Sequence, residues 1–506
     1  MSFAKNSTFL ETRPARSLSN DSLALGIVFA LVLTLVQRLL GGVRGVVFCR
    51  LMTDQELGQW SMLNSFLMIL GPFAVLGLPG SFGKFVEHYF QQGQLRSFLR
   101  RVGWLCTATT ILVAGSIWIM PGFFSQQILG EPDQVGLMRL MSATLVALTA
   151  FNYLTSLIES MRQIRLASIM RFVSGVSFTL LGIVLLLVSP NGSISATWAF
   201  LLSSVLGSAP AVWFLWNQRQ VIVDEGAYLD ARQMWFRLTP YALWWWASNM
   251  VFNLFELSDR YMLIHYSRAE WDAAQALVGQ YHSGRIIPLL MVGVASMLSG
   301  LLLPYVAKSW SDGNIAKACS QLNWTIKLST IGMMAANVVL LFGAPLIFDT
   351  VLDGRYNDGL SVLPLTMVYC TWFSIITVSQ DFLWVSENGK YAVATMAIGL
   401  VANILFNMLL IPSFGLWGAV VATSIGNLLG LVLLFLANRR FSCRPDFGCW
   451  MAVLLPVLLL LPAMYAAFGL GLFAMFSAMG TWVFSKTEKQ EIAELFHSQF
   501  LAKFQR

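Results

Sequence analysis

The chain has 506 residues, of which 57% are hydrophobic and only 11% are charged. Soluble domains carry roughly 25% charged residues, so this chain folded in water would expose more apolar surface than its polar residues cover. The net charge is +7, but the basic residues stand between apolar segments, which is typical of membrane topology and not of a nucleic-acid surface. The composition therefore predicts an all-α polytopic membrane protein with no nucleic-acid partner.

The predicted elements are about fourteen transmembrane helices, each an apolar stretch of roughly 20 residues. In chain order they cover residues 24–47, 58–82, 102–120, 136–158, 169–188, 195–216, 240–264, 277–304, 326–347, 360–384, 391–411, 414–437, 450–467 and 469–484. The last two are the least clearly divided, because residues 450–484 form an almost unbroken apolar run.

These spans divide the chain into six parts. We expect a cytoplasmic N-terminal tail (1–23), an N-lobe of six spans (24–216), a cytoplasmic linker (217–239), a C-lobe of six spans (240–437), two further spans (450–484) and a cytoplasmic amphipathic tail (485–506). In that tail, apolar residues such as Leu495 and Phe496 share one helical face, which favours a helix lying at the membrane surface.

The basic residues predict the orientation. Most of those outside the spans fall in one set of alternating segments, whereas the opposite set holds only Arg50, Arg268 and Arg355. Since cytoplasmic loops carry the excess of lysine and arginine, both termini should be cytoplasmic.

An internal repeat runs through the two lobes. The sequence Gly58-Gln59-Trp60 opens the second span, and Gly279-Gln280-Tyr281 lies near the start of the eighth. Downstream, Gly93 is echoed by Gly313. The copies are six spans apart, so they share one orientation. This indicates a parallel repeat about an axis along the membrane normal, an arrangement typical of transporters.

Ionisable residues within the spans are the candidate site, because they are costly in a bilayer. Arg38 and Arg44 lie on one polar face of the first span with Gln37. We expect both to contact the cargo, although interfacial placement or pairing with carboxylates is the alternative. Arg285, inside the eighth span, is a further candidate for cargo binding.

The seventh span carries a polar stripe. Asn249, Asn253, Glu256 and Arg260 fall on one narrow helical face, so the stripe lines either a cavity or a helix interface. Glu256 and Arg260, at positions i and i+4, also form a favourable ion pair, which leaves a purely structural role open. Glu256 and Asp381 are the candidate ion-coupling carboxylates, although for Asp381, at the inner end of the tenth span, a location at the membrane interface is the favoured alternative.

Arginine indicates the charge of the cargo. It stays charged in a cavity of low dielectric constant and holds phosphate oxygens in bidentate fashion. Several arginines facing one cavity favour a polyanion such as a diphosphate, whereas a cation exporter needs carboxylates. The six cysteines form no C-x-x-C pair, so we expect neither a structural metal nor a disulfide framework, and no motif indicates a cofactor or an enzyme.

Several short motifs resemble the polysaccharide transporter family of the multidrug/oligosaccharidyl-lipid/polysaccharide flippase superfamily. They are the segments 50–60 and 76–78 of the first two spans, Ser258-Asp259-Arg260 in the seventh, and residues 411–423 leading into the twelfth. The resemblance implies two six-helix lobes in a pseudo-twofold arrangement like that of multidrug exporters, with a central cavity that opens alternately to the two sides of the bacterial inner membrane.

The resemblance also implies a cargo and partners. It implies flipping of an undecaprenyl-diphosphate-linked oligosaccharide repeat unit for surface polysaccharide biosynthesis, with arginines meeting the diphosphate and the last two spans forming a groove for the polyprenyl tail. Partners would be this lipid-linked glycan, membrane lipids, and glycosyltransferases or a polymerase of the same pathway, and the chain would act as a monomer. The Arg38-x-x-Gly41-x-x-Arg44 spacing is similar to the first helix of lipid II flippases, which leaves the cargo open.

Two other functions are weighed. An ion-coupled drug or cation antiporter of the same fold would depend on Glu256 or Asp381. A membrane-bound oligosaccharide polymerase or ligase would need a sizeable outer loop with catalytic polar residues, and the longest predicted outer loop, residues 121–135, has no convincing catalytic set.

Overall fold

The computed structural model describes residues 23–218 and 229–490, and this part of the chain is helical without any β-strand. The N-terminal helices are α1 (Leu23–Leu51), α2 (Asp54–Ala74), η1 (Leu78–Ser81), α3 (Phe82–Gln91), α4 (Leu95–Ile119), α5 (Pro121–Leu129), α6 (Val135–Ser160), α7 (Ile164–Val188) and α8 (Gly192–Asn217). The C-terminal helices are α9 (Ala231–Tyr266), α10 (Trp271–Ser311), α11 (Ile315–Leu346), η2 (Ile347–Val351), α12 (Asn357–Ser379), α13 (Asp381–Val385), α14 (Gly389–Arg440), α15 (Phe447–Leu454), η3 (Leu455–Leu460) and α16 (Ala463–Met479).

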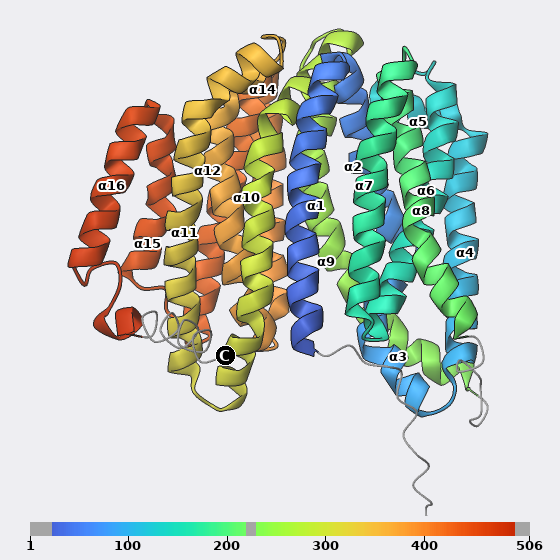
Figure 1. The fold of residues 1–506 in the computed structure, drawn as a ribbon, viewed down its shortest axis with the longest axis horizontal. Helices are drawn as coiled ribbons and strands as arrows, with labels where there is room; N and C mark the ends of the chain where they lie inside the picture. The colour runs from blue at the N-terminus through green and yellow to red at the C-terminus, as the bar shows by residue number, and fades with distance from the viewer. Residues whose placement is uncertain (1–22, 219–228, 491–506) are drawn as a thin grey trace, which may run out of the picture.

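The helices form two bundles side by side, with α15 and α16 packed on the outside of the second (Figure 1). Nine of the described helices are long and apolar enough to cross a membrane, and α2 with α3 form a tenth span that bends by 62°. α14 crosses twice, because its 52 residues are broken at Gly415, where φ is +51° and ψ is −122°. Adding α9, α15 with η3, and α16 gives the predicted fourteen, and the helical two-lobe fold is confirmed.

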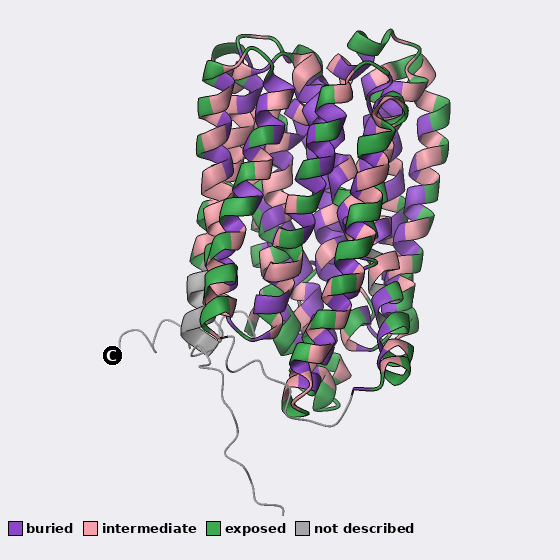
Figure 2. Ribbon diagram, turned by 90° about the vertical axis from the view of Figure 1, so that its right-hand side faces the viewer, coloured by how far each residue is buried: buried purple, intermediate pink, exposed green. Residues whose placement is uncertain are grey.

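The outer surface suits a bilayer. Exposed residues follow the outward faces of the helices (Figure 2), and many of them are large and apolar, such as Leu112, Ile119 and Val188. A soluble protein avoids continuous exposed apolar surface of this kind, whereas lipid accommodates it.

The repeat seen in the sequence has a structural counterpart. Gly93 and Gly313 each end a helix in the left-handed conformation, with φ of +66° and +75°. In both turns the glycine N–H donates to the carbonyl three residues earlier, at 3.1 Å and 3.0 Å, and the next helix begins two residues later. A side chain would be strained at this φ, so both copies keep glycine.

Three predicted boundaries are wrong. The second span ends at Ala74 and not at residue 82, because Pro72 and the left-handed Gly77 break the helix before η1. The last two spans divide at residues 461–462 and not at residue 468, because Pro462 cannot continue the preceding helix. α9 begins at Ala231, inside the predicted linker. The N-terminal tail and most of the amphipathic tail lie outside the described residues.

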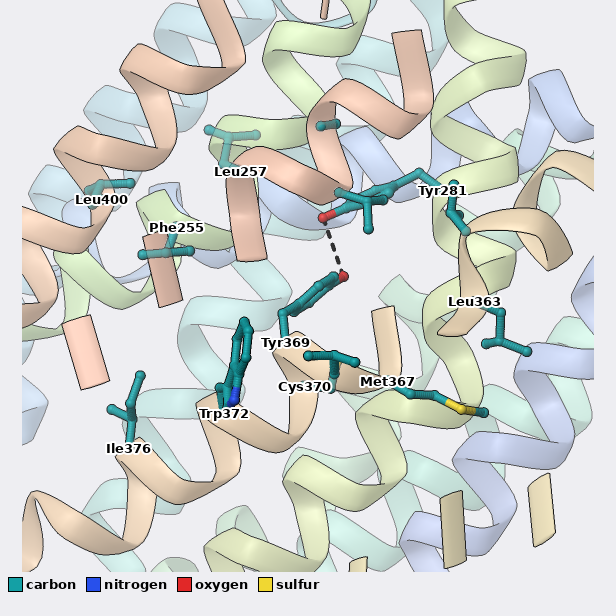
Figure 3. Close-up of a cluster of buried hydrophobic side chains, with 14 of the residues drawn as sticks. Phe255, Leu257, Tyr281, Leu363, Met367, Tyr369, Cys370, Trp372, Ile376 and Leu400 are labelled. Carbon is teal, nitrogen blue, oxygen red and sulfur yellow. Dashed lines mark hydrogen bonds between the residues drawn. The ribbon is translucent and has the colours of Figure 1, made fainter. Parts of the chain in front are cut away.

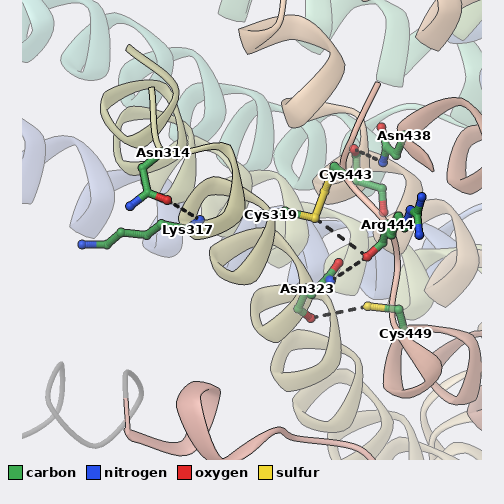
Figure 4. The surroundings of a disulfide bond; sticks show 9 residues. Asn314, Lys317, Cys319, Asn323, Asn438, Cys443, Arg444 and Cys449 are labelled. Atoms are coloured by element: carbon green, nitrogen blue, oxygen red, sulfur yellow. Dashed lines mark hydrogen bonds between the residues drawn. A yellow bond between two sulfur atoms is a disulfide. The ribbon is translucent and has the colours of Figure 1, made fainter. Parts of the chain in front are cut away.

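A disulfide bond links α11 to the segment between α14 and α15, near the start of the C-terminal helices. The prediction that the cysteines form no disulfide is therefore wrong. Cys319 of α11 is joined by a disulfide to Cys443, which follows α14 (Figure 4). The two cysteines are 124 residues apart, so their spacing gave no indication of the bond.

Lys327 is a second point of attachment between α11 and the C-terminal helices. Its side chain is fully buried in α11, and its Nζ lies 2.6 Å from carboxylate oxygens of both Asp446 and Glu488. These two acids flank the α15–α16 segment in the chain. The ion pairs therefore hold both ends of that segment against α11.

Candidate functional site

The two lobes meet most tightly where α2 crosses α10. A Cβ atom placed on Gly58 would lie 1.8 Å from the carbonyl oxygen of Gln275, and one placed on Gly279 would lie 1.9 Å from that of Asp54. Each glycine thus touches the carbonyl four residues before the other glycine, which is the symmetry that the GQW/GQY repeat predicts. We call this crossing the seal.

Polar contacts surround the seal. Gln59 Nε2 donates to Gln275 Oε1 at 2.9 Å, and Gln55 Nε2 donates to Asp272 Oδ1 at 2.7 Å. Arg355, which follows η2, donates to the backbone carbonyl of Arg50 at the end of α1. The lobes are therefore closed at the end of the bundle that the basic residues predict to be outside.

Next to the seal, towards the middle of the bundle, lies a group of charged side chains. Glu256 of α9 accepts from Arg285 Nη2 of α10 at 2.6 Å, and its other oxygen lies 3.6 Å from Arg260 Nη1. Arg260 also donates to Ser65 Oγ of α2, on the opposite lobe. The expected ion pair of Glu256 with Arg260 is confirmed, but Arg285 is the nearer partner.

Arg44 joins this group from α1. Its guanidinium lies 4.2 Å from the centre of the Phe178 ring of α7, and the adjacent Gly45 packs against Ile286 of α10, the residue after Arg285. On α10, His282 Nδ1 is 3.2 Å from Ser61 Oγ of α2. We call Arg44, Arg260 and Arg285, with Glu256 between the last two, the cationic cluster.

The cluster has spare hydrogen-bond donors. Arg260 and Arg285 are 5% and 4% exposed. Within the described part of the chain, Nε of Arg260 and both Nε and Nη1 of Arg285 are buried without an acceptor. Arg260 and Arg285 share the one carboxylate of Glu256, and Arg44 adds a third guanidinium, so the cluster has an excess of positive charge. Because buried donors are costly when unpaired, the arrangement suits an anion with several oxygens, such as a diphosphate.

Aromatic residues form the wall behind Arg285. Its guanidinium lies 5.0 Å from the Tyr281 ring centre and 5.9 Å from that of Tyr369. Figure 3 shows the two tyrosines with their hydroxyl groups facing one another, 3.5 Å apart. These contacts fix the direction of the guanidinium.

Asp259, which sequence reasoning did not single out as a site residue, is a buried carboxylate at 1% exposure. Its Oδ1 accepts from the amides of Asn403 and Asn407, both at 2.8 Å, and its Oδ2 accepts from the hydroxyls of Tyr281 and Thr423, both at 2.5 Å. Two amide N–H groups and two hydroxyl groups therefore satisfy both oxygens of this carboxylate. The Ser258-Asp259-Arg260 motif was the available signal, but it was interpreted only as a family signature.

Two of the predicted residues stay apart from the cluster. Arg38 is exposed, and its side chain lies against Gly293 of α10. Asp381 is buried and accepts from Ser299 Oγ at 2.7 Å and 2.9 Å. Ser299 lies fourteen residues beyond Arg285 on α10, which is roughly 20 Å along the helix. Asp381 therefore does not face Glu256.

Asn249 and Asn253 line a separate cavity of about 460 Å³ in the half of the molecule away from the seal. It lies mainly within the N-lobe, with walls from α1, α2, α6 and α7, and α9 closes it from the other lobe. We call this cavity the chamber. A second, small cavity of about 20 Å³ touches Glu256, Asp259 and Arg285, which is room for about one water molecule.

Comparisons with known proteins identify the family. Residues 23–310, more than half of the chain, match the model of the polysaccharide biosynthesis protein family. The chain belongs to this family. Residues 276–488 also match the model of the lipid II flippase MurJ. MurJ of Bacillus subtilis (strain 168) is 22% identical over 446 residues, which are 81% of each chain.

Solved structures show the same fold at low identity. An inward-facing multidrug resistance MATE family transporter has a TM-score of 0.67 at 14% identity, over 82% of this chain and 98% of its own. The inward closed form of lipid II flippase MurJ has a TM-score of 0.64 at 15% identity, over 95% of this chain and all of its own. As a member of the polysaccharide biosynthesis family, the chain is a multi-spanning transporter of the flippase superfamily and not an enzyme, and the family handles lipid-linked substrates.

Proposed function

We propose that this chain flips an undecaprenyl-diphosphate-linked oligosaccharide repeat unit across the bacterial inner membrane, with both of its termini in the cytoplasm. The observation that carries the proposal is the cationic cluster. Arg260 of α9 and Arg285 of α10 share the carboxylate of Glu256 between the lobes, and three of their N–H groups have no acceptor among the described residues. Arg44 of α1, stacked on Phe178, adds a third positive charge. A lipid diphosphate supplies both the charge and the oxygens that this cluster lacks.

Alternating access provides the mechanism. With the seal closed, the diphosphate enters from the cytoplasmic side and displaces Ser65 from Arg260 and Glu256 from Arg285. Because the cluster draws side chains from both lobes, binding there changes the contacts between the lobes. That is the differential interaction a ligand needs to shift a conformational equilibrium. Separation of α2 from α10 at the seal then exposes the cargo to the opposite side.

Glu256 is the carboxylate best placed for coupling among those chosen from the sequence, because its protonation would release both arginines for the cargo. Asp259, which lies three residues after Glu256 and accepts hydrogen bonds from neutral side chains, is a second proposed position for a coupling ion. The coupling role of Asp381 stays a prediction. Its carboxylate accepts from Ser299, near the far end of α10, and not from a residue of the cationic cluster.

The test is a flipping assay with the purified full chain in liposomes. The probe is an undecaprenyl-diphosphate-linked saccharide with a fluorophore on its sugar, bleached from outside by dithionite. Without flipping, only the outer-leaflet probe is bleached, whereas a flippase exposes the whole population. We expect Arg260→Gln and Arg285→Gln to return bleaching to the protein-free level. Arg232 is exposed on α9, the helix of Arg260, so Arg232→Gln should leave bleaching complete. Full activity in the Arg260/Arg285 double variant would refute the proposal.

Lipid II itself is a second candidate cargo, favoured by the match of residues 276–488 to the lipid II flippase model and by the Bacillus subtilis relative. Each unlabelled lipid is added to the bleaching assay as a competitor of the fluorescent probe. The lipid that competes better is the cargo. Uptake of a cationic dye that depends on Glu256, with no effect of either lipid, would instead favour the antiporter.

A further inference from the structure

The chamber has the size of a ligand site and polar walls. Its volume of about 460 Å³ falls within the roughly 300–1,000 Å³ that is usual for small-molecule pockets. One side is apolar, from residues such as Met68 and Pro72 of α2 and Phe151 of α6. The other side presents amides and hydroxyls. A pyranose ring has the same division, with C–H faces and hydroxyl edges.

The charges in the chamber cancel. Its lining contains one acid and one base, Glu159 and Arg171, and these two form an ion pair with each other. Gln37 Nε2 donates to the backbone carbonyl of Arg171 at 3.2 Å, which ties α1 to α7 beside the pair. The chamber thus differs from the cationic cluster, because it offers no unpaired charge to an ionic ligand.

Uncommitted hydrogen-bonding groups line the same space. The side chains of Asn152, Ser156 and Ser174 have no hydrogen-bond partner among the described residues, and Asn152 is exposed within the chamber. Asn253 Nδ2 donates to Asn249 Oδ1 at 3.1 Å, which leaves the second half of each amide available. Groups that both donate and accept match sugar hydroxyls, which also do both.

The chamber and the cationic cluster lie on one line along α9. Asn249, Asn253, Glu256 and Arg260 share a face of that helix. From Asn253 to Arg260 is seven residues, or roughly 10 Å. A diphosphate held by Arg260 therefore places the sugars attached to it beside Asn253, one or two sugar units away.

We infer that the chamber is the saccharide subsite of the transporter and that it takes an uncharged oligosaccharide. The inference rests on the proposed function, since it assumes that the cationic cluster holds the diphosphate of the same molecule. It separates the two cargoes left open above. Lipid II carries a peptide with carboxylates, for which the chamber has no free cation.

The test measures binding of three probes to the purified full chain in detergent. They are undecaprenyl diphosphate, the same lipid carrying a neutral trisaccharide, and lipid II. We expect the trisaccharide lipid to bind at least tenfold more tightly than bare undecaprenyl diphosphate. Asn152→Leu and Asn253→Leu keep the branched shape of the side chain but remove its hydrogen bonds, and each should weaken trisaccharide binding about tenfold while leaving undecaprenyl diphosphate binding unchanged. Asn191→Leu, on the exposed loop before α8, is the matched control and should bind like the wild type.

The outcomes separate the two proposals. If the wild type binds none of the three lipids, the proposed function fails. If it binds bare and glycosylated lipid equally, or if the two chamber variants match the control, the diphosphate site stands and the saccharide subsite is refuted. Preferential binding of lipid II would also overturn the inference, because it requires a cationic environment that the chamber does not have.

Discussion

Replacement of a glycine in the seal should hold the transporter open at that end. An alanine Cβ at position 58 would lie 1.8 Å from the carbonyl oxygen of Gln275, while ordinary contacts begin at 3.4 Å. The difference of 1.6 Å must be met by moving α2 away from α10, because the obstacle is backbone and cannot rotate aside. Such movement stretches the Gln59–Gln275 bond from 2.9 Å beyond hydrogen-bonding distance.

The magnitude follows from packing energetics. Overpacking of a tight contact costs about 1–3 kcal/mol, and here the cost falls only on the sealed state. A penalty of about 2 kcal/mol changes the ratio of sealed to open molecules about 30-fold. Gly58→Ala and Gly279→Ala should have similar effects because their contacts are related by symmetry, and the double variant should have a larger one.

Distances between spin labels measure the opening. Asp133 of the N-lobe and Asp358 of the C-lobe are exposed near the seal, and cysteines introduced there accept the label while the native free cysteines are buried. We expect both alanine variants to shift the population to longer distances and to lose flipping. Gly136→Ala is the control, because nothing lies within 4 Å of its added Cβ. Unchanged distances with full flipping in Gly58→Ala would refute the assignment of the seal.

Three further predictions follow from the buried polar groups. Lys327→Met leaves the carboxylate of Glu488 buried without its cationic partner and should lower the free energy of unfolding by about 3–5 kcal/mol, seen as an earlier thermal transition, and the double variant with Glu488→Met should recover part of it. Asp259→Asn should abolish the dependence of flipping on a sodium or proton gradient while undecaprenyl diphosphate still binds; retention of that dependence would exclude Asp259 as the coupling group. Cys319→Ser should lower the thermal transition only in oxidised samples, and an equal loss in reduced samples would show that the disulfide with Cys443 is not the cause.

The features predictable from the sequence are those set by local composition. Spans follow from the need to bury apolar side chains in lipid, and the α9 stripe from Asn249 to Arg260 follows from helical periodicity alone. The glycine repeat also required no structure, because both copies are short and contiguous. The lobes and most of the helices were accessible in this way.

The missed features depend on contacts distant in the chain. Arg285 is 29 residues from Glu256, and three of the four donors to the Asp259 carboxylate are more than 140 positions away. Periodicity on one helix cannot indicate which neighbour it faces. Arg38 shows the same limit, because it shares a helical face with Arg44 in projection, yet its side chain lies on Gly293, outside the cluster.

The seal is symmetric between the two lobes, whereas the cationic cluster is not. At the seal the two lobes are equivalent, since Gly58 and Gly279 make the same contact from opposite sides, and a symmetric crossing separates without favouring either lobe. The cationic cluster is asymmetric, because Arg260 and Arg285 come from the C-lobe and meet Ser65 of the N-lobe. A cargo that takes Arg260 from Ser65 removes a contact between the lobes next to the seal. In the mechanism that we propose, recognition of the cargo weakens the closed state through the asymmetric residues, and the contact between the two glycines restores that state once the cargo has left.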